Sequence, residues 1–317
     1  MTARRSSFSL VHTQNDIRLR PTEQGPLWGY TLVVDRATAA VREESWGSVV
    51  GASSVGISLS AEAVLGVVDL TDCQYLLVVN STAHVGYIGG REVSRVESAA
   101  CVPLRADGVV PEEHKKMVQT IERLLCSGLY YGPELDLTLW LQGKIAKMQQ
   151  AQLQKNRDGS VKLTHVASSH FWWNRDMCLS MTGALEVDSR WFAVTVQGFV
   201  GIEMVQLGRH EARLALLSRR SRQRSGMRFN VRGIDDDGNV ANFVETELLF
   251  AVDDQPWASF TQVRGSMPVF WTQTGERATE VTRDPELAAP AFSAHHAALC
   301  RRYGTVAYWN LCADRRP

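Results

Sequence analysis

The stretch from Arg219 to Trp271 constrains the fold of this chain more than any other. It opens with a run of arginines, which are Arg219, Arg220, Arg222, Arg224, Arg228 and Arg232. An acidic turn follows, and then two apolar-rich segments, Val240–Val252 and Trp257–Trp271. Within the turn, Asp237-Gly238 supplies the positive-φ residue that a tight hairpin requires. We therefore predict an antiparallel β meander over this stretch.

The arginines at the front of the meander follow a strand-like pattern. Apolar and polar residues alternate from Met227 to Arg232, the period of a half-buried strand. This pattern places Arg228 and Arg232 together on the polar face. Several guanidinium groups beside a glycine-containing turn can frame an anionic ligand such as phosphate.

A structural interpretation of the arginines competes with this one. An arginine run is usually a solvated face whose ion pairs contribute little each, and composition alone favours that interpretation. The acidic residues close enough in sequence to neutralise the run are Asp235, Asp236, Asp237, Glu245 and Glu247. Glu245 and Glu247 are two apart on an expected strand and share a face. We expect them to pair with arginines rather than act as general acids.

The order of residues in this stretch resembles that of the Sac-domain phosphoinositide phosphatases. The positions that carry the resemblance are Ser218 to Gly233, Ile234, Asp235, Gly238, Ala241 to Glu247, and Arg264 to Trp271. Weaker similarity extends in both directions, from about Ile17 to Leu311. Its segments are Gly66 to Gly90, Tyr130-Tyr131, Asp136 to Thr138, Phe171 to Asn174, and Arg302 through Asn310-Leu311.

The resemblance implies an α+β fold in two parts. The first is an N-terminal Sac-type mixed β/α domain, expected over residues 17–168 after a loosely ordered N-terminus at residues 1–16. The second, residues 169–317, is expected to be the front part of a Sac phosphatase catalytic domain. The linker-like stretch Lys155 to Ser160 lies close to this boundary.

The resemblance also implies an activity, which is hydrolysis of phosphate from phosphatidylinositol phosphate head groups through a cysteinyl-phosphate. No metal or other cofactor is implied. The expected location is cytosolic, at the cytoplasmic face of the endoplasmic reticulum or Golgi membranes. The residues expected to bind the head group are Arg224, Arg228 and Arg232 for charge, Asn242 and Glu245 for framing, and Arg264 and Trp271 from the next strand.

The cysteines depart from the family's pattern, in which the nucleophilic Cys precedes an Arg by six positions. Five of the six cysteines have another residue at that distance, and Cys312 lies too near the chain end. We therefore expect the catalytic loop to lie beyond Pro317. The alternative is a catalytically inactive fragment that binds phosphoinositides or a protein partner.

Composition excludes several other classes of protein. The formal net charge is +0, and Phe229 is the only aromatic residue among the arginines, which argues against nucleic-acid binding. No metal-ligand or disulfide spacing occurs among the six cysteines and eight histidines, so buried free thiols are expected. No signal peptide or membrane-spanning run is apparent in the sequence.

Periodicity predicts most of the remaining elements. The expected strands are Trp28–Val34, Val64–Leu70, Tyr75–Val79, His84–Gly90, Trp191–Gly201, His210–Leu217 and Val306–Leu311. Three helices are expected. The first begins at Pro111 and ends before Gly128, the second spans Leu137–Leu153, and the third spans Pro290–Tyr303.

Overall fold

The structure is a computed structural model that describes residues 7–46, 56–145, 168–184, 186–227, 230–253, 255–274 and 278–310. The chain divides into two compact units. Unit 1 comprises Met1–Arg222 and Glu245–Gln262, and unit 2 comprises Gln223–Val244 and Val263–Pro317. The domain boundary expected near residue 168 falls inside unit 1. The limits of the two compact units therefore differ from the expected domain limits.

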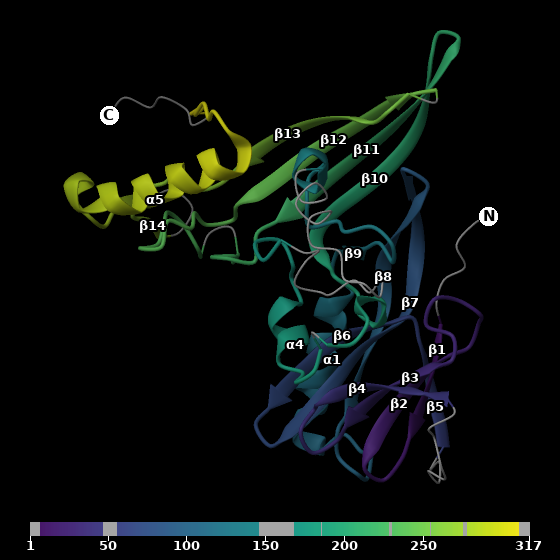
Figure 1. Cartoon of the computed structure of the whole chain (residues 1–317). Coiled ribbons are helices and arrows are strands. Elements are labelled where there is room, and N and C mark those ends of the chain that lie inside the picture. Colours follow the sequence, from purple (N-terminus) through teal and green to yellow (C-terminus); the bar gives the residue numbers. More distant parts are fainter. Residues whose placement is uncertain are drawn as a thin grey trace. The chain divides into compact units, whose positions relative to one another are not determined.

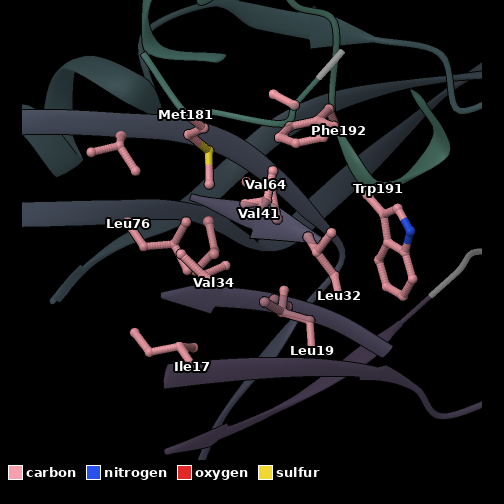
Figure 2. Close-up of a cluster of buried hydrophobic side chains, with 14 of the residues drawn as sticks. Ile17, Leu19, Leu32, Val34, Val41, Val64, Leu76, Met181, Trp191 and Phe192 are labelled. Carbon is pink, nitrogen blue, oxygen red and sulfur yellow. The ribbon is translucent and has the colours of Figure 1, made fainter. Parts of the chain in front are cut away.

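Unit 1 begins with an antiparallel five-stranded sheet of order β4-β3-β2-β1-β5. Its strands are β1 (Phe8–His12), β2 (Asp16–Pro21), β3 (Tyr30–Asp35), β4 (Val41–Ser45) and β5 (Gly56–Ala61). Alternating apolar residues of β1, β2 and β3 point into one core, where the fully buried Trp191 packs against Phe8 at a ring-centroid distance of 5.0 Å. Figure 2 shows how side chains from distant parts of the chain meet there.

The second sheet has eight strands in the order β13-β12-β11-β10-β9-β8-β7-β6. Its strands are β6 (Ala63–Leu70), β7 (Cys73–Ile88), β8 (Arg91–Pro103), β9 (Leu129–Tyr131), β10 (Val196–Leu207), β11 (His210–Arg220), β12 (Val244–Val252) and β13 (Ala258–Arg264). Short helical segments of unit 1 are η2 (Glu112–His114), α1 (Lys115–Leu125), α4 (Arg175–Leu179) and η3 (Ser189–Trp191). Buried residues of α1 join a second core with alternate residues of β7 and β8.

Unit 2 contains the loop after Arg222, the two-stranded sheet of β14 (Trp271–Thr274) and β15 (Ala278–Val281), and α5 (Pro285–Tyr303) (Figure 1). The predicted tight turn is present, because Gly238 has a φ of 86° and its N–H donates to the Asp235 carbonyl. Only one bridge, Ile234 to Val240, flanks the turn, so this part of the meander is a turn without a strand pair.

Sheets and a few helices together confirm the predicted α+β class. Strands overlap all but two of the predicted strand segments, and predicted helices correspond to α1 and α5. The strand expected at Val306–Leu311 is wrong over its described residues, 306–310, which form neither helix nor strand. Of the helix expected at Leu137–Leu153, the described residues 141–145 are helical and residues 137–140 are not. The rest of that segment and the Lys155–Ser160 linker lie outside the described residues.

Two further expectations need correction. Phe8–His12, expected to be loosely ordered, is instead strand β1, which pairs with β2 and β5 and buries Phe8 completely. The strand expected over Met227–Arg232 is also wrong, because the described residues of that segment are turn and irregular structure. The Val231 and Arg232 carbonyls accept hydrogen bonds from the side chains of Asn242 and Arg224 in the same loop rather than from a neighbouring strand.

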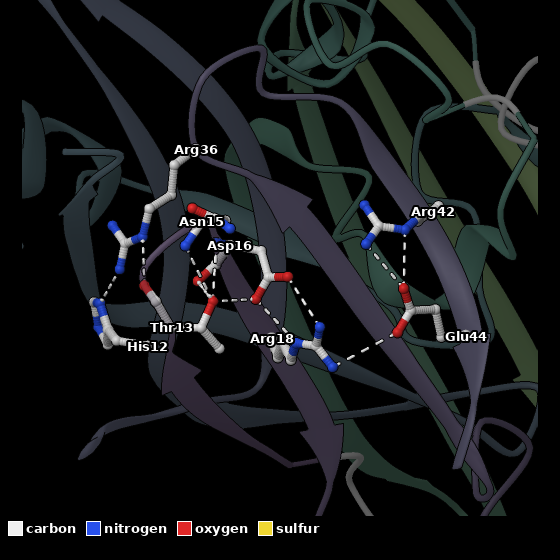
Figure 3. Close-up of polar contacts among 8 residues, drawn as sticks. All are labelled: His12, Thr13, Asn15, Asp16, Arg18, Arg36, Arg42 and Glu44. Carbon is white, nitrogen blue, oxygen red and sulfur yellow. Dashed lines mark hydrogen bonds and ion pairs between the residues drawn. The ribbon is translucent and has the colours of Figure 1, made fainter. Parts of the chain in front are cut away.

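Polar side chains on β1, β2 and β4, and in the connections between strands, form hydrogen bonds and ion pairs on the five-stranded sheet (Figure 3). Arg18 donates to both carboxylate oxygens of Asp16, at 2.9 and 3.0 Å, and the Thr13 hydroxyl donates to Asp16 at 2.6 Å. Burial raises the pKa of Asp16, but these hydrogen bonds outweigh burial and leave that pKa below its ordinary value. The carboxylate therefore remains ionised, and its ion pair with Arg18 on β2 persists, to lower pH than an isolated Asp would allow.

Among the described residues, no helix is both long and apolar enough to cross a bilayer. The same part of the chain holds no group of three or more His, Cys, Asp or Glu residues positioned to bind a metal ion.

Candidate functional site

The arginine run does not form one continuous face, because its first members are taken up inside unit 1. Arg219 is 1% exposed and donates to Glu245 at 2.9 Å and also to Glu247, both of which are buried. It donates further to the carbonyls of Leu137 and Leu139. The expected pairing of Glu245 and Glu247 with an arginine is therefore present, and it lies in the core rather than at the surface.

Arg220 and Arg222 are also engaged within unit 1. The Arg220 guanidinium lies over the Trp173 ring, 5.8 Å from its centroid. Arg222 donates to the Asp176 carboxylate at 2.7 Å and to the Ser169 carbonyl at 2.8 Å. Both contacts fix the end of β11 against the segment that follows Ser168.

The rest of the run lies in unit 2, in residues 223–243, which we call the arginine loop. Two of its residues, Arg224 and Asn242, adopt left-handed backbone conformations with φ of 46° and 52°. Such conformations are uncommon outside glycine and must be held by their surroundings. Here the Asn242 N–H donates to the Arg224 carbonyl, and the Asn242 side chain accepts from Gly226 and donates to Val231.

Arg224 stabilises the arginine loop rather than pointing away from it. Its guanidinium donates to the carbonyl of Arg232 at 2.7 Å and to that of Gly233 at 3.3 Å. Gly233 itself has a φ of 69°, and a Cβ there would lie 2.5 Å from the Val269 carbonyl oxygen. The close approach of this segment to Val269 therefore requires glycine.

Arg232 is half-buried, and residues of β14 hold its guanidinium in place. Its Nε and Nη2 atoms donate to the Gln273 amide oxygen at 3.0 and 2.7 Å. Its guanidinium lies over the Trp271 ring, 5.2 Å from the centroid. A guanidinium that is stacked and bonded along one edge is pre-oriented, so little rotamer entropy is lost when it binds an oxyanion.

The remaining predicted site residues are placed as follows. Arg264, at the end of β13, is exposed, and its side chain forms no ion pair or hydrogen bond within the described residues. Trp271 is half-buried, and its indole N–H is buried without a hydrogen-bond acceptor in that same part of the chain. Glu245 lies in unit 1 and is bonded to Arg219, and Arg228 lies outside the described residues.

The acidic turn does not neutralise the arginine loop through the contacts that the structure describes. Asp236 pairs with Arg283, whose guanidinium also lies 3.6 Å from the centroid of the Phe270 ring. Asp235 accepts from the backbone N–H and side-chain amide of Asn239. Unit 2 therefore brings together four predicted site residues, Arg224, Arg232, Asn242 and Trp271, around one loop and one short strand.

Two residues that matter to this arrangement were not predicted from sequence. Gln273 orients Arg232, and its position two residues after Trp271 on a strand was a readable signal that both share a face. Ser266 accepts a hydrogen bond from the Gly233 N–H at 2.8 Å, and no sequence pattern marks that contact.

Comparison with known proteins finds a family model and several relatives that match the part of the chain containing this site. The model of the SacI homology domain family matches residues 62–317. The chain is 32% identical over 312 residues to synaptojanin of Caenorhabditis elegans, covering 95% of this chain and 26% of the relative. It is 34% identical over 271 residues to synaptojanin-1 of Homo sapiens, covering 81% of this chain and 16% of the relative.

A third relative carries an enzymatic name. The phosphoinositide phosphatase SAC7 of Arabidopsis thaliana is 32% identical over 253 residues, covering 77% of this chain and 40% of the relative. The chain thus spans well under half the length of each of these three relatives.

Proposed function

The chain belongs to the SacI homology domain family, and on that premise we propose that it recognises phosphatidylinositol phosphate head groups for hydrolysis of their phosphate monoesters. The observation that carries the proposal is the family match over residues 62–317, which includes the whole arginine loop. The name of the Arabidopsis thaliana relative supports the same substrate class. The site of action we propose is the cytoplasmic face of an internal membrane.

The geometry of unit 2 suggests how such a head group is bound. A phosphate monoester offers several oxygens with shared negative charge, and a planar guanidinium donates to two of them in parallel. Arg232 has this form and is already oriented by Gln273 and Trp271. We assign Arg232 and the exposed Arg264 as phosphate-binding residues, with Arg228 as a further cation, and Trp271 as the wall beside Arg232.

The other predicted site residues have supporting roles in this proposal. Arg224 and Asn242 hold the arginine loop through its backbone carbonyls and N–H groups. Glu245 anchors the start of β12 by pairing with Arg219. These three act on the head group through the positions of other residues.

We propose a thiolate as the attacking group. It bonds to phosphorus as the ester bond from phosphorus to the inositol oxygen breaks, the inositol oxygen leaves with the bonding pair and takes up a proton, and water then hydrolyses the cysteinyl-phosphate to phosphate and free thiol. A cysteine with an arginine six positions later is absent from the 317 residues, so this chain contributes binding rather than the nucleophile. The same fact favours a second candidate function, which is phosphoinositide or partner binding without catalysis.

Phosphate release separates the two functions. An antibody raised against this chain would precipitate the native protein from its own cells, and the recombinant 317-residue chain would be assayed beside it. We expect release from vesicles containing phosphatidylinositol phosphates by the native protein alone. Binding without release by either sample would support the non-catalytic function, and release by the recombinant chain would contradict the assignment of the nucleophile.

A further inference from the structure

One cluster in unit 2 has a different chemistry from the arginine loop and does not depend on the proposed function. It lies at the C-terminal end of α5. His296 and Cys300 are four residues apart on this helix and therefore share a face. The Cys300 sulfur lies 3.4 Å from His296 Nε2, and His296 Nδ1 lies 3.2 Å from the Tyr308 hydroxyl.

Aromatic neighbours hold the imidazole in this position. The Phe292 ring stacks with the His296 ring at an interplanar angle of 8° and a centroid distance of 6.4 Å. Tyr308 contacts both rings, at centroid distances of 6.0 Å to Phe292 and 5.8 Å to His296. The three rings fix the direction in which each His296 nitrogen points.

The thiol is accessible, unlike most of the described cysteines. Cys73, Cys101 and Cys178 are buried, at 6%, 6% and 0% exposure. Cys126 and Cys300 are half-buried, and of these two only Cys300 contacts an imidazole within the described part of the chain. Cys126 is therefore a matched internal control with similar access and without a base.

We propose that Cys300 is a nucleophilic modification site for soft electrophiles, with His296 as its general base and Tyr308 as the residue that orients His296. A nucleophile bonded to a base, and a base bonded to an orienting group, is the arrangement that activates thiols in proteins. Neutral imidazole has one N–H donor and one acceptor. When Nδ1–H donates to Tyr308, Nε2 is the acceptor that faces the thiol.

Reaction of the Cys300 thiol with an electrophile combines a proton transfer to His296 with displacement of the leaving group. The thiol proton passes to His296 Nε2, the sulfur electron pair forms a bond to the electrophilic carbon, and the leaving group departs with its bonding pair. The resulting imidazolium retains the Tyr308 oxygen as an acceptor for Nδ1–H. Burial, together with the nearby Cys300, raises the pKa of Tyr308, which keeps that hydroxyl protonated at neutral pH.

The charged residues of α5 nearest the cluster are basic. Arg301 and Arg302 follow Cys300 directly in the last turn of α5, and the acidic residue of that helix, Glu286, lies in its first turn. His295, which faces Gly238 on another side of α5, has its pKa lowered, by burial first and by the proximity of His296 last. It therefore adds little positive charge at neutral pH.

Alkylation rates test the proposal directly. The whole chain would be treated with limiting iodoacetamide at pH 7, digested with trypsin, and the modified peptides quantified by mass spectrometry over time. An unassisted thiol is only a few per cent ionised at that pH, so we expect Cys300 to react about tenfold faster than Cys126. His296→Ala should lower the Cys300 rate to that of Cys126, and Tyr308→Phe should lower it less.

Two results would overturn the proposal. One is equal reactivity of Cys300 and Cys126 in the unaltered chain. The other is a Cys300 rate that His296→Ala leaves unchanged while the helical circular dichroism signal is also unchanged. The Cys126 rate, measured in the same samples, shows whether either variant has disturbed the fold.

Discussion

Replacing Arg219 with methionine is expected to destabilise unit 1 by about 3–5 kcal/mol. Arg219 is the cation shared by Glu245 and Glu247, which are 0% and 1% exposed. Removing it leaves two buried carboxylates without a compensating charge and two carbonyls, of Leu137 and Leu139, without this donor. Each loss is costly because a buried polar group cannot recover its hydrogen bonds from water.

Urea unfolding of the variant and the unaltered chain, followed by fluorescence, measures this effect. Arg220→Met is the matched control, since Arg220 is the next residue on β11 and lies over Trp173 with its guanidinium only half-buried. We expect the control to cost about 1 kcal/mol or less. Equal small effects of the two substitutions would show that the Arg219 cluster does not carry the stability assigned to it.

A combined variant separates charge imbalance from simple loss of contacts. Replacing Arg219, Glu245 and Glu247 together with apolar residues of similar size removes all three buried charges. Such replacements are often neutral or stabilising, so we expect this variant to recover most of the stability that Arg219→Met loses.

Asn174→Ala is expected to destabilise unit 1 by about 3 kcal/mol or more. The Asn174 side chain is 2% exposed and joins three separate segments. Its amide donates to the carbonyls of Leu65 and Ala193, each at 2.8 Å. Its oxygen accepts from the Thr195 N–H at 3.0 Å, the Thr195 hydroxyl at 2.8 Å and the Trp172 indole N–H at 3.0 Å.

The estimate follows from the number of groups that lose a partner. Alanine leaves several buried donors and acceptors unsatisfied, each costing about 1–3 kcal/mol when no replacement is available. The same unfolding assay measures the loss, and Asn230→Ala is the control because Asn230 is exposed. A loss as small as that of the control, expected within about 0.5 kcal/mol, would refute the central role of Asn174.

Local periodicity was enough to predict much of the fold. The alternating or continuous apolar residues of β6 and β7 form strands that bury most of those residues in a core. The same pattern predicted β10 and β11, although Phe199, Met204, Leu207 and Leu216 on these two strands are exposed. The helix of α1 followed from apolar spacing and from the stop at Gly128. These signals are local, so a single sequence carries them.

The wrong predictions share a physical cause, which is dependence on distant partners. Strand β1 exists because Phe8–His12 pairs with β2 and with residues of β5 about fifty positions away, and its short polar-flanked sequence does not show this. The Met227–Arg232 segment has the alternation of a strand. Arg224, Asn242 and Ser266 bond its neighbourhood in a loop conformation instead.

The candidate site was predictable to a similar degree. Sequence placed Glu245 and Glu247 on one face and anticipated arginine partners, but it did not identify Arg219 as the partner or the core as the location. It also chose Arg232 and Trp271, which the structure brings together, and missed Gln273, which accepts two hydrogen bonds from Arg232. Long-range contacts between a loop and a later strand determine such details.

Vesicle binding by the 317-residue chain would show whether the arginine loop recognises the phosphoinositide head group. Co-sedimentation would compare vesicles containing phosphatidylinositol phosphates with phosphatidylserine vesicles of matched charge. A lost charge-assisted bidentate contact is equivalent to about 10–100-fold in affinity, so Arg232→Ala should weaken binding to the first vesicles by at least about tenfold. Arg95→Ala, which removes an exposed arginine paired with Glu97, should have little effect. Equal binding to both vesicle types, or equal effects of the two substitutions, would contradict recognition of the head group by the arginine loop.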